Sequence, residues 1–411
     1  MLYPPIALKS GKDIPVRAGH PWVFSEAIDK QASAIGELED GALVQVHDAR
    51  RNNLGIGTWN SLTSIAIRLL SREKERMIDQ DFFVEQFLSL ERWKLPRLPS
   101  QTNGYRLVHA EADGLPGLIV DRYENVFVFQ LHTAGMDRLR AEIIAGLEQA
   151  FQPTAIVERS DLDVRRIEGL KDAPITVHLD RREDKNLPLL VPFQEYGFTF
   201  TADVLKGQKT GFFLDQREAR HAVHDLAKGR RVLNLFGYTG AFSIHAAKGG
   251  ADFVATVDVS RTALETSERQ FTLNHLDPAD ESRHLFLEAD VFDLLREQEI
   301  PGAPYDLIIC DPPALAKSSK HLPQALRAYT DLNTACLQQL HPGGILVTSS
   351  CSGRLEPEDF RTMLRISAGH ARRDVRILEW ITQPVDHAER LAFPEGRYLK
   401  TAILEVTRIL G

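Results

Sequence analysis

The sequence predicts an α/β protein whose C-terminal half contains a mostly parallel β-sheet covered by helices on both faces. From about Arg230 onward, apolar strands alternate with helical stretches. These strands are continuous apolar runs, as expected for parallel strands buried on both faces. The length of 411 residues exceeds that of one ordinary domain, so two or three domains are expected. The expected strands are 231–236, 253–257, 284–288, 305–310 and 344–349.

The N-terminal half has a different pattern. Residues 1–75 contain short segments rich in β-branched residues, separated by Gly and Asn, which predicts a small β-rich domain. Residues 76–190 combine an apolar helical stripe at about 79–95 with strands such as 126–131, so an α+β domain is expected there. The parallel sheet then belongs to a third domain at 191–411.

Composition and charge limit the class of protein. Hydrophobic residues make up 43% of the chain and charged residues 26%, as in soluble globular proteins. No apolar run approaches the roughly 20 residues of a membrane span, and the N-terminus lacks a signal-peptide pattern. The three cysteines lie far apart, so we expect no disulfide framework, no metal site and a cytoplasmic location. The net charge of −8 leaves the partner open, because nucleic acid requires only a local basic face.

A cofactor site is predicted just after the strands of the C-terminal half, because ligands of parallel sheets bind outside the carboxyl ends of the strands. After the first strand, Gly237 and Gly240 are expected to allow a tight turn and close approach of a ligand to the backbone. Asp258 follows the second strand and can accept both hydrogen bonds of a ribose diol. Asp290 and Val291 follow the third strand, where they are expected to meet an adenine edge.

The identity of the cofactor follows from what this arrangement lacks. The full G-x-G-x-x-G fingerprint of dinucleotide binding is absent, so a pyrophosphate is not expected. An adenosyl group without a pyrophosphate indicates S-adenosylmethionine. The residues of this half expected to bind it are Asn234, Phe236, Tyr238, Thr239, Gly240, Asp258, Val259, Asp290 and Val291.

Seven motifs are spread over essentially the whole chain, at 19–24, 111–117, 158–161, 207–217, 311–313, 350–353 and 393–400. Through them the sequence resembles the bacterial large-subunit (23S) ribosomal RNA 5-methylcytosine methyltransferases that carry an N-terminal PUA domain. The resemblance implies a PUA domain, a middle α+β domain and a Rossmann-like class I methyltransferase domain. It also implies methyl transfer to carbon 5 of a cytidine through a covalent cysteine adduct, with ribosomal RNA as the partner. Whether two copies of the chain form a homodimer stays open.

The resemblance adds a further part of the cofactor site. It implies that residues 209–215 close over the cofactor. The residues of this segment expected to contact it are Lys209, Thr210, Phe213 and Asp215. The chain departs from the family pattern at Ala388, where the family has proline, and this puts only the shape of that loop in doubt.

One cysteine is expected to be the nucleophile. Carbon 5 of cytosine is a poor nucleophile, so its methylation requires a thiolate that first attacks carbon 6. Cys351 lies just after the fifth strand, at the ligand end of the sheet, within one of the motifs. Cys310 adjoins Asp311, but neighbouring side chains of a strand point to opposite faces, so Cys310 is expected to face away from the site. Cys336 lies among apolar residues of a helix and is expected in the core.

Asp311 is the second expected catalytic residue, because its carboxylate can hydrogen-bond the cytosine edge; a helix cap or turn is the alternative. Many RNA 5-methylcytosine enzymes carry a product-releasing cysteine in this motif, and this chain has none there. Ala314 stands where enzymes acting on exocyclic amines often have an aromatic residue. This disfavours N-methylation of guanine or adenine but leaves that alternative open. A further alternative is an RNA-binding assembly factor whose methyltransferase domain is silent.

The N-terminal domain is expected to contribute an RNA-contacting surface. Residues 20–24 supply aromatic rings, and Lys9, Lys12 and Arg17 supply positive charge. RNA is bound through its backbone charge and by stacking on exposed rings. Packing of the two larger rings, Trp22 and Phe24, in the core is the alternative.

Overall fold

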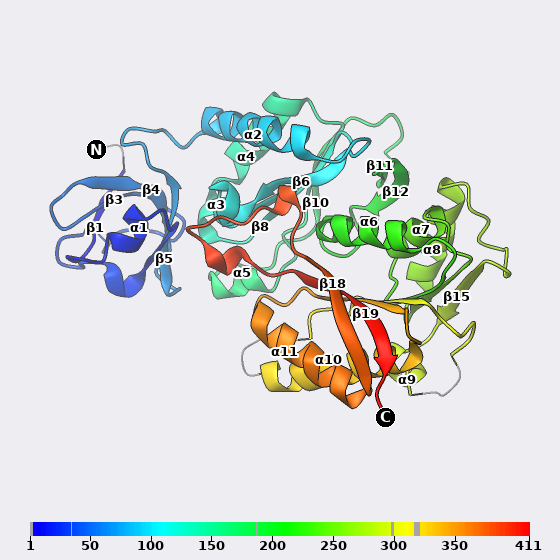
Figure 1. Ribbon diagram of the computed structural model, residues 1–411. Helices are drawn as coiled ribbons and strands as arrows, with labels where there is room; N and C mark the ends of the chain where they lie inside the picture. The colour runs from blue at the N-terminus through cyan, green and yellow to red at the C-terminus, as the bar shows by residue number, and fades with distance from the viewer. Residues whose placement is uncertain (1–2, 34, 186–187, 297–299, 316–320) are drawn as a thin grey trace. The chain divides into compact units, whose positions relative to one another are not determined.

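The computed structural model describes residues 3–33, 35–185, 188–296, 300–315 and 321–411 (Figure 1). The chain forms two compact units. The first comprises Met1–Gly197, Thr201–Leu214 and Val385–Gly396, and the second comprises Phe198–Phe200, Asp215–Pro384 and Arg397–Gly411. The segment 385–396, expected within the C-terminal domain, thus belongs to the first unit.

The N-terminal part of the first unit is a β-rich domain, as predicted. Its elements are β1 (Pro5–Ala7), α1 (Ile14–Arg17), β2 (Trp22–Phe24), β3 (Leu43–His47), β4 (Asn53–Trp59) and β5 (Ile65–Ser71). The strands form one sheet in the order β1-β3-β4-β5-β2, in which only β1 and β3 are parallel. The β-branched side chains of Val44, Val46 and Ile67 are fully buried in one cluster, so this small domain has a core of its own.

The middle part of the first unit is an α+β domain, as predicted. Its elements are α2 (Gln80–Lys94), β6 (Gly104–His109), β7 (Leu118–Tyr123), β8 (Val126–Leu131), α3 (Ala134–Arg138), α4 (Arg140–Phe151), β9 (Ala155–Glu158), α5 (Val164–Ile167) and β10 (Thr176–Asp180). The strands form a sheet in the order β10-β9-β8-β7-β6. Helix α2 begins after Asp79, whose carboxylate caps the helix by accepting the Phe82 N–H at 3.0 Å. Two strands, β11 (Leu190–Glu195) and β12 (Phe198–Asp203), follow in the chain.

The second unit contains the predicted parallel sheet. Its strands are β13 (Arg231–Leu235), β14 (Phe253–Asp258), β15 (His284–Glu288), β16 (Leu307–Cys310), β17 (Ile345–Ser350), β18 (Arg373–Ile381) and β19 (Lys400–Ile409). Their order is β15-β14-β13-β16-β17-β19-β18. The first five strands pair in parallel, and β19 pairs antiparallel with both β17 and β18. The strand order reverses between β13 and β16, and ligands of such sheets bind at this switch point.

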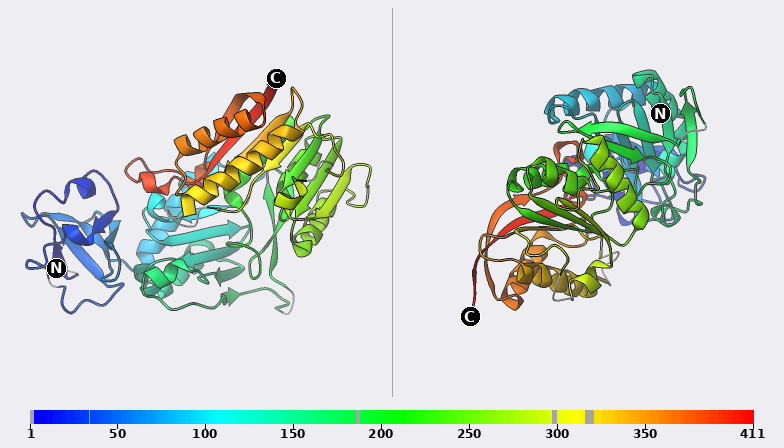
Figure 2. Two further views of the ribbon diagram at one scale, coloured as in Figure 1. Left: turned by 90° about the horizontal axis from the view of Figure 1, so that it is seen from below. Right: turned by 90° about the vertical axis from the view of Figure 1, so that its right-hand side faces the viewer.

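Helices cover both faces of this sheet. They are α6 (Arg217–Leu226), α7 (Ala241–Lys248), α8 (Arg261–Leu273), α9 (Val291–Leu294), α10 (Leu322–Gln339) and α11 (Pro357–His370). Helices α6, α7 and α8 lie on one side and α10 and α11 on the other (Figure 1). The views in Figure 2 show β18 and β19 side by side at one edge of the sheet. Among the described residues, every helix is too short or too polar to cross a membrane.

Candidate active site

The loop after β13 is held in an unusual backbone conformation. Phe236 and Tyr238 have positive φ angles, 59° and 47°, although neither is glycine. Such conformations cost on the order of 1–3 kcal/mol each and are concentrated at functional sites. The backbone N–H of Tyr238 donates to the carboxylate of Asp258 at 2.8 Å, and the carbonyl of Thr239 accepts from the Gln270 side chain at 3.2 Å. These contacts hold the loop at the switch point of the sheet, which supports a binding role.

The glycines of this loop lie in close contact with neighbouring elements. A Cβ atom at Gly240 would lie 1.9 Å from the hydroxyl oxygen of Ser267, and one at Gly237 would lie 2.6 Å from the Thr256 methyl group. These distances leave no room for a side chain at either position, and the expected approach of a ligand to this backbone stays a prediction. The two glycines allow the loop to pack closely against α8 and β14, and Gly240 also has a φ of 79°.

Asp258 lies at the end of β14 with both carboxylate oxygens oriented by the backbone. One oxygen accepts the N–H of Tyr238 at 2.8 Å, and the other accepts the N–H of Ser260 at 2.9 Å. An ionised carboxylate has about four acceptor positions, so it can accept further hydrogen bonds from a ligand. The neighbouring side chain of Val259 is largely exposed. Asp258 is thus a preoriented acceptor at the ligand end of the sheet.

Three other predicted cofactor residues have structural roles. The side chain of Asn234 is buried and donates to the hydroxyl of Ser243 at 2.9 Å. Val291 is buried in the apolar core. Asp290 caps α9 by accepting the N–H of Phe292 at 2.8 Å, and it is exposed. Any contact that Asn234 or Val291 makes with a cofactor would therefore go through the backbone, whereas the Asp290 carboxylate remains accessible.

The segment 209–215 is divided between the two units. Lys209, Thr210 and Phe213 belong to the first unit, and Asp215 belongs to the second. The ammonium of Lys209 lies 4.3 Å from the centre of the Phe213 ring, and Lys209 has a positive φ of 54°.

Thr210 anchors this segment to the middle sheet of the first unit. Its side chain is fully buried, and its hydroxyl donates to the carboxylate of Asp121 at 2.6 Å. The hydroxyl of Tyr123 lies 2.9 Å from the Thr210 hydroxyl oxygen. The Thr210 side chain is therefore committed to the interior, which differs from the expected cofactor contact.

Asp311 follows β16 and is held by a buried amide. Its carboxylate accepts a hydrogen bond from the side chain of Gln216 at 2.8 Å. Asp215, beside Gln216 in the chain, accepts the hydroxyl of Tyr398 at 2.8 Å. The sequence did not predict these contacts of Gln216 and Tyr398, because each contact joins segments that lie far apart in the chain. They orient the acidic groups of this region.

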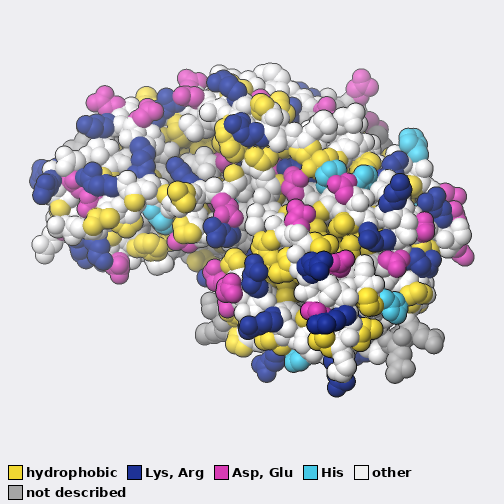
Figure 3. Space-filling model, viewed as in Figure 1, with side chains coloured by type: hydrophobic (Ala, Val, Ile, Leu, Met, Phe, Trp, Pro, Cys, Tyr) yellow, Lys and Arg dark blue, Asp and Glu magenta, His cyan; other side chains and the backbone are white. Residues whose placement is uncertain are grey.

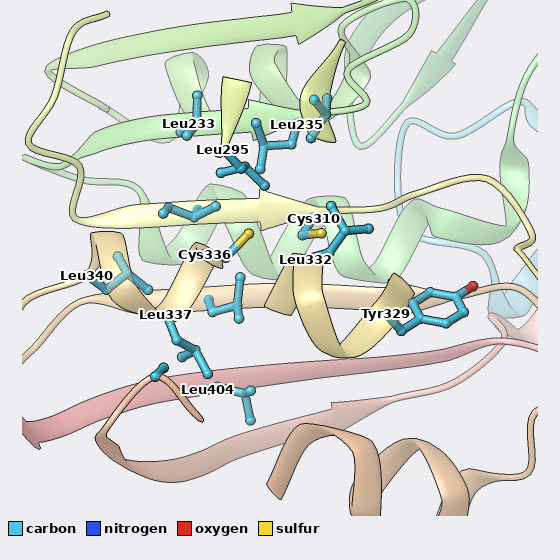
Figure 4. Close-up of a cluster of buried hydrophobic side chains, with 14 of the residues drawn as sticks. Leu233, Leu235, Leu295, Cys310, Tyr329, Leu332, Cys336, Leu337, Leu340 and Leu404 are labelled. Atoms are coloured by element: carbon cyan, nitrogen blue, oxygen red, sulfur yellow. The ribbon is translucent and has the colours of Figure 1, made fainter. Parts of the chain in front are cut away.

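The three cysteines have different surroundings. Cys310 and Cys336 are fully buried in the apolar core of the second unit, as predicted, and Figure 4 shows their sulfur atoms inside this cluster. A hydrogen bond with Cys336, together with burial, raises the pKa of Cys310 well above its ordinary value. Cys351 is partly exposed and follows β17 at the carboxyl end of the sheet. Cys351 is therefore the cysteine that a ligand can reach.

A buried lysine, whose role the sequence pattern did not indicate, lies near Cys351. Lys400 begins β19, is 1% exposed, and donates from its ammonium to the carbonyls of Ser352 and Leu355, both at 2.6 Å. Burial lowers the pKa of Lys400 to about 8, and the opposing influence of the Cys351 thiolate raises it. The ammonium thus holds the backbone that carries Cys351 and interacts with its charge.

A buried hydroxyl pair completes these surroundings. The hydroxyl of Ser350 donates to the hydroxyl of Tyr329 at 3.0 Å, and both side chains are fully buried. Burial raises the pKa of Tyr329 to about 12, and the charge of the Cys351 thiolate acts in the same direction. Tyr329 therefore stays neutral at pH 7. The positive charge near Cys351 comes from Lys400.

Comparisons with known proteins find methyltransferases over the whole chain. Residues 190–384 match the sequence model of S-adenosylmethionine-dependent methyltransferases, and residues 6–72 match that of PUA-like domains. The chain is 40% identical over 402 residues to "Ribosomal RNA large subunit methyltransferase I" of Shewanella denitrificans, covering 98% of this chain and 99% of the relative. It is 41% identical over 405 residues to the protein of that name from Shewanella amazonensis, with the same coverage.

Solved structures share the fold. SMU.776, a methyltransferase crystallised with SAH, superposes with a TM-score of 0.81 at 24% identity, covering 98% of this chain and 100% of that one. A second S-adenosylmethionine-dependent methyltransferase structure, from Streptococcus mutans, has a TM-score of 0.78 at 23% identity with the same coverage. At these identities the similarity concerns the fold alone.

Proposed function

The chain belongs to the family of S-adenosylmethionine-dependent methyltransferases named ribosomal RNA large subunit methyltransferase I, and we propose that it methylates carbon 5 of a cytidine in ribosomal RNA. Family membership gives the cofactor and the class of reaction. The choice of carbon 5 rests on one observation. Cys351 is the partly exposed cysteine at the ligand end of the sheet, and a buried ammonium lies near it.

The residues at the switch point fit the cofactor. S-adenosylmethionine, when bound, supplies a methyl group on a positively charged sulfur. Asp258 offers a preoriented carboxylate for a ribose diol, and the strained loop 236–240 lies against it. The residues of the second unit proposed to hold the cofactor are Phe236, Tyr238, Thr239, Gly240, Asp258, Val259 and Asp290. None of them is Lys or Arg, in keeping with a ligand that has no pyrophosphate.

Cys351 is proposed to act as a thiolate. It adds to carbon 6 of the cytosine, which makes carbon 5 nucleophilic toward the methyl group. Loss of the carbon 5 proton and cleavage of the carbon–sulfur bond then restore the thiolate. A nearby positive charge favours the ionised form of a thiol, and Lys400 supplies that charge from a buried position. Lys400 is therefore a positioning residue for the nucleophile.

Asp311 is proposed to contact the cytosine edge. It follows β16, and β16 pairs directly with β17, the strand that ends before Cys351. The hydrogen bond from Gln216 fixes the orientation of the Asp311 carboxylate. A base in structured RNA must be extruded from its helix before a thiol can reach carbon 6, so the target cytidine is expected to be flipped out. Covalent trapping with 5-fluorocytidine RNA tests this chemistry directly.

The cofactor assignment has a separate test. Asp258→Ala should weaken binding of S-adenosylmethionine by about 1.5–3 kcal/mol, the range for hydrogen bonds to a charged group. The loss has two sources, because Asp258 contacts the ligand and also holds the backbone of Tyr238. Titration calorimetry measures the change.

A matched control is Asp306→Ala. The carboxylate of Asp306 also accepts a backbone N–H, from Arg231 at 2.9 Å, but at the amino end of β13. This variant should bind the cofactor as the wild type does. Unchanged affinity in a folded Asp258→Ala variant would remove Asp258 from the site.

A further inference from the structure

Two of the three cations that the sequence indicated for RNA binding, Lys12 and Arg17, are paired with acidic side chains within the protein. Lys12 forms an ion pair with Glu26 at 3.2 Å, and Lys9 donates to the backbone carbonyl of the same residue at 2.8 Å. Arg17 is paired with both Asp13 and Asp48. Figure 3 likewise shows basic and acidic side chains interspersed over the visible face. A phosphate site must therefore be sought among cations that lack an acidic partner.

Two arginines of the first unit meet this condition. Arg72 follows β5, and its guanidinium donates to the backbone carbonyls of Val16 and of His20, the latter at 3.3 Å. Arg390, in the segment 385–396, donates to the backbone carbonyl of Glu111 at 3.3 Å. Carbonyl oxygens orient these groups without cancelling their charge. Within the described ranges, neither guanidinium has a carboxylate within ion-pair distance, and both side chains are exposed.

The two arginines are carried by segments that lie close together. Arg72 donates to the backbone carbonyl of His20, and the His20 ring is 5.8 Å from the ring of Phe393, three residues after Arg390. Desolvation and the charge of Arg390 lower the pKa of Arg72. A Cβ atom on Gly19 would lie 3.0 Å from that of Ala392, so the loop of Arg390 lies against the N-terminal domain. Keeping like charges close is unfavourable unless an anion binds between or beside them.

Aromatic rings lie beside this pair. The Phe393 ring is 4.8 Å from that of Trp22 and 5.8 Å from that of His20, which joins the loop to β2. Trp22 donates from its indole nitrogen to the Glu111 carboxylate at 3.0 Å, so its ring is fixed. Phe24, at the end of this row, is 42% exposed, and Leu391 is fully exposed. An exposed ring beside unpaired cations is the combination that binds single-stranded RNA.

We propose that Arg72 and Arg390 form a phosphate-binding site for a single-stranded segment of the RNA substrate, with Phe24 as a stacking platform for one base. This inference rests on the proposed RNA substrate and is independent of the carbon 5 chemistry. The site joins the N-terminal domain to a segment that lies more than 300 residues later in the chain.

The test measures binding of a labelled single-stranded RNA oligonucleotide to the full chain, without S-adenosylmethionine, over a series of salt concentrations. Each of Arg72→Ala and Arg390→Ala should weaken binding about tenfold. Each should also reduce the slope of log affinity against log salt by about 0.7, the contribution of one phosphate contact on a single strand. Phe24→Ala should weaken binding about tenfold and leave the slope unchanged, because stacking involves no counterion release.

Two controls separate charge from structure. Arg72→Lys keeps the charge and should retain the salt slope. Arg138→Ala removes an exposed arginine of the same unit that is already paired with Glu39 at 2.7 Å, and it should bind as the wild type does. Deleting residues 1–75 could not replace these point variants. The deletion would leave the buried carboxylate of Glu168 without Arg68, its partner at 2.7 Å.

Unchanged affinity and slope in the Arg72→Ala, Arg390→Ala double variant would overturn the proposal, and so would equal losses in Arg138→Ala. If the double variant loses affinity as expected while methylation at carbon 5 is not found, the RNA site stands and only the chemistry fails.

Discussion

Ribosomal RNA transcribed with 5-fluorocytidine should trap the wild-type protein as a covalent adduct that survives denaturing gels when S-adenosylmethionine is present. After methyl transfer, carbon 5 of the fluorinated base carries no proton that a base can remove, so the carbon–sulfur bond to the enzyme persists. Because every cytidine in the transcript is replaced, the target nucleotide is fluorinated wherever it lies. Peptide mapping by mass spectrometry should place the link at Cys351.

Variants at two cysteines make this result specific. Cys351→Ala should abolish the adduct and reduce methyl transfer by several orders of magnitude, as removal of a nucleophile does, while cofactor binding is retained. Cys336→Ala removes a thiol that is fully buried in the core, and it should keep both adduct and activity. Methyl transfer by Cys351→Ala at the normal rate would refute the carbon 5 mechanism and favour N-methylation of a guanine or adenine.

Replacing Lys400 should change the reactivity of Cys351 toward a simple alkylating agent. In Lys400→Met, the Cys351 thiol should ionise at a higher pH than in the wild type, because the thiolate loses its neighbouring cation. Alkylation by iodoacetamide at pH 7 should then be about tenfold slower than in the wild type. Mass spectrometry follows the modified peptide, and the buried Cys310 and Cys336 remain unmodified in the folded protein.

The pH dependence of this effect has a definite sign. Lys400 has a pKa of about 8, so its ammonium is charged below that pH and neutral above it. The difference between wild type and Lys400→Met should therefore be largest below pH 8 and should disappear as the pH rises above it. Lys400→Arg keeps a cation and should retain a profile close to the wild type.

An exposed lysine is the control for general effects of losing an ammonium. Lys248, in the second unit, also donates to a backbone carbonyl, that of Asn274 at 3.2 Å. Lys248→Met should leave the alkylation profile of Cys351 unchanged. An unchanged profile in Lys400→Met, with a normal thermal unfolding curve, would leave Lys400 a purely structural role.

The parallel part of the sheet was predictable because its strands are continuous apolar runs. A strand was expected at 253–257, for example, and β14 spans Phe253–Asp258. The antiparallel strands β18 and β19 were not predicted. Strand β18 lies at the edge of the sheet, and most of its side chains are exposed or partly exposed, so its apolar pattern is weak.

The candidate site was predictable where a motif fixes both residue type and position, as for Asp258 and Cys351. It was not predictable where tertiary pairing decides. Lys400 lies near Cys351 because β19 pairs with β17 in a register that joins Lys400 to Ser350, fifty residues apart. A motif also does not show whether a side chain is buried, so the interior position of Thr210 could be seen only in the structure.

The place of β19 between β17 and β18 has a consequence for fragments of this protein. Residues 190–384 match the methyltransferase family on their own, yet this range ends before β19 begins. A protein cut to that range would turn the central strand β17 into an open edge with unpaired N–H and C=O groups, which invites aggregation. It would also lack Lys400, whose ammonium we propose to favour the thiolate form of Cys351. A catalytically competent fragment of the second unit therefore has to retain the C-terminal strand.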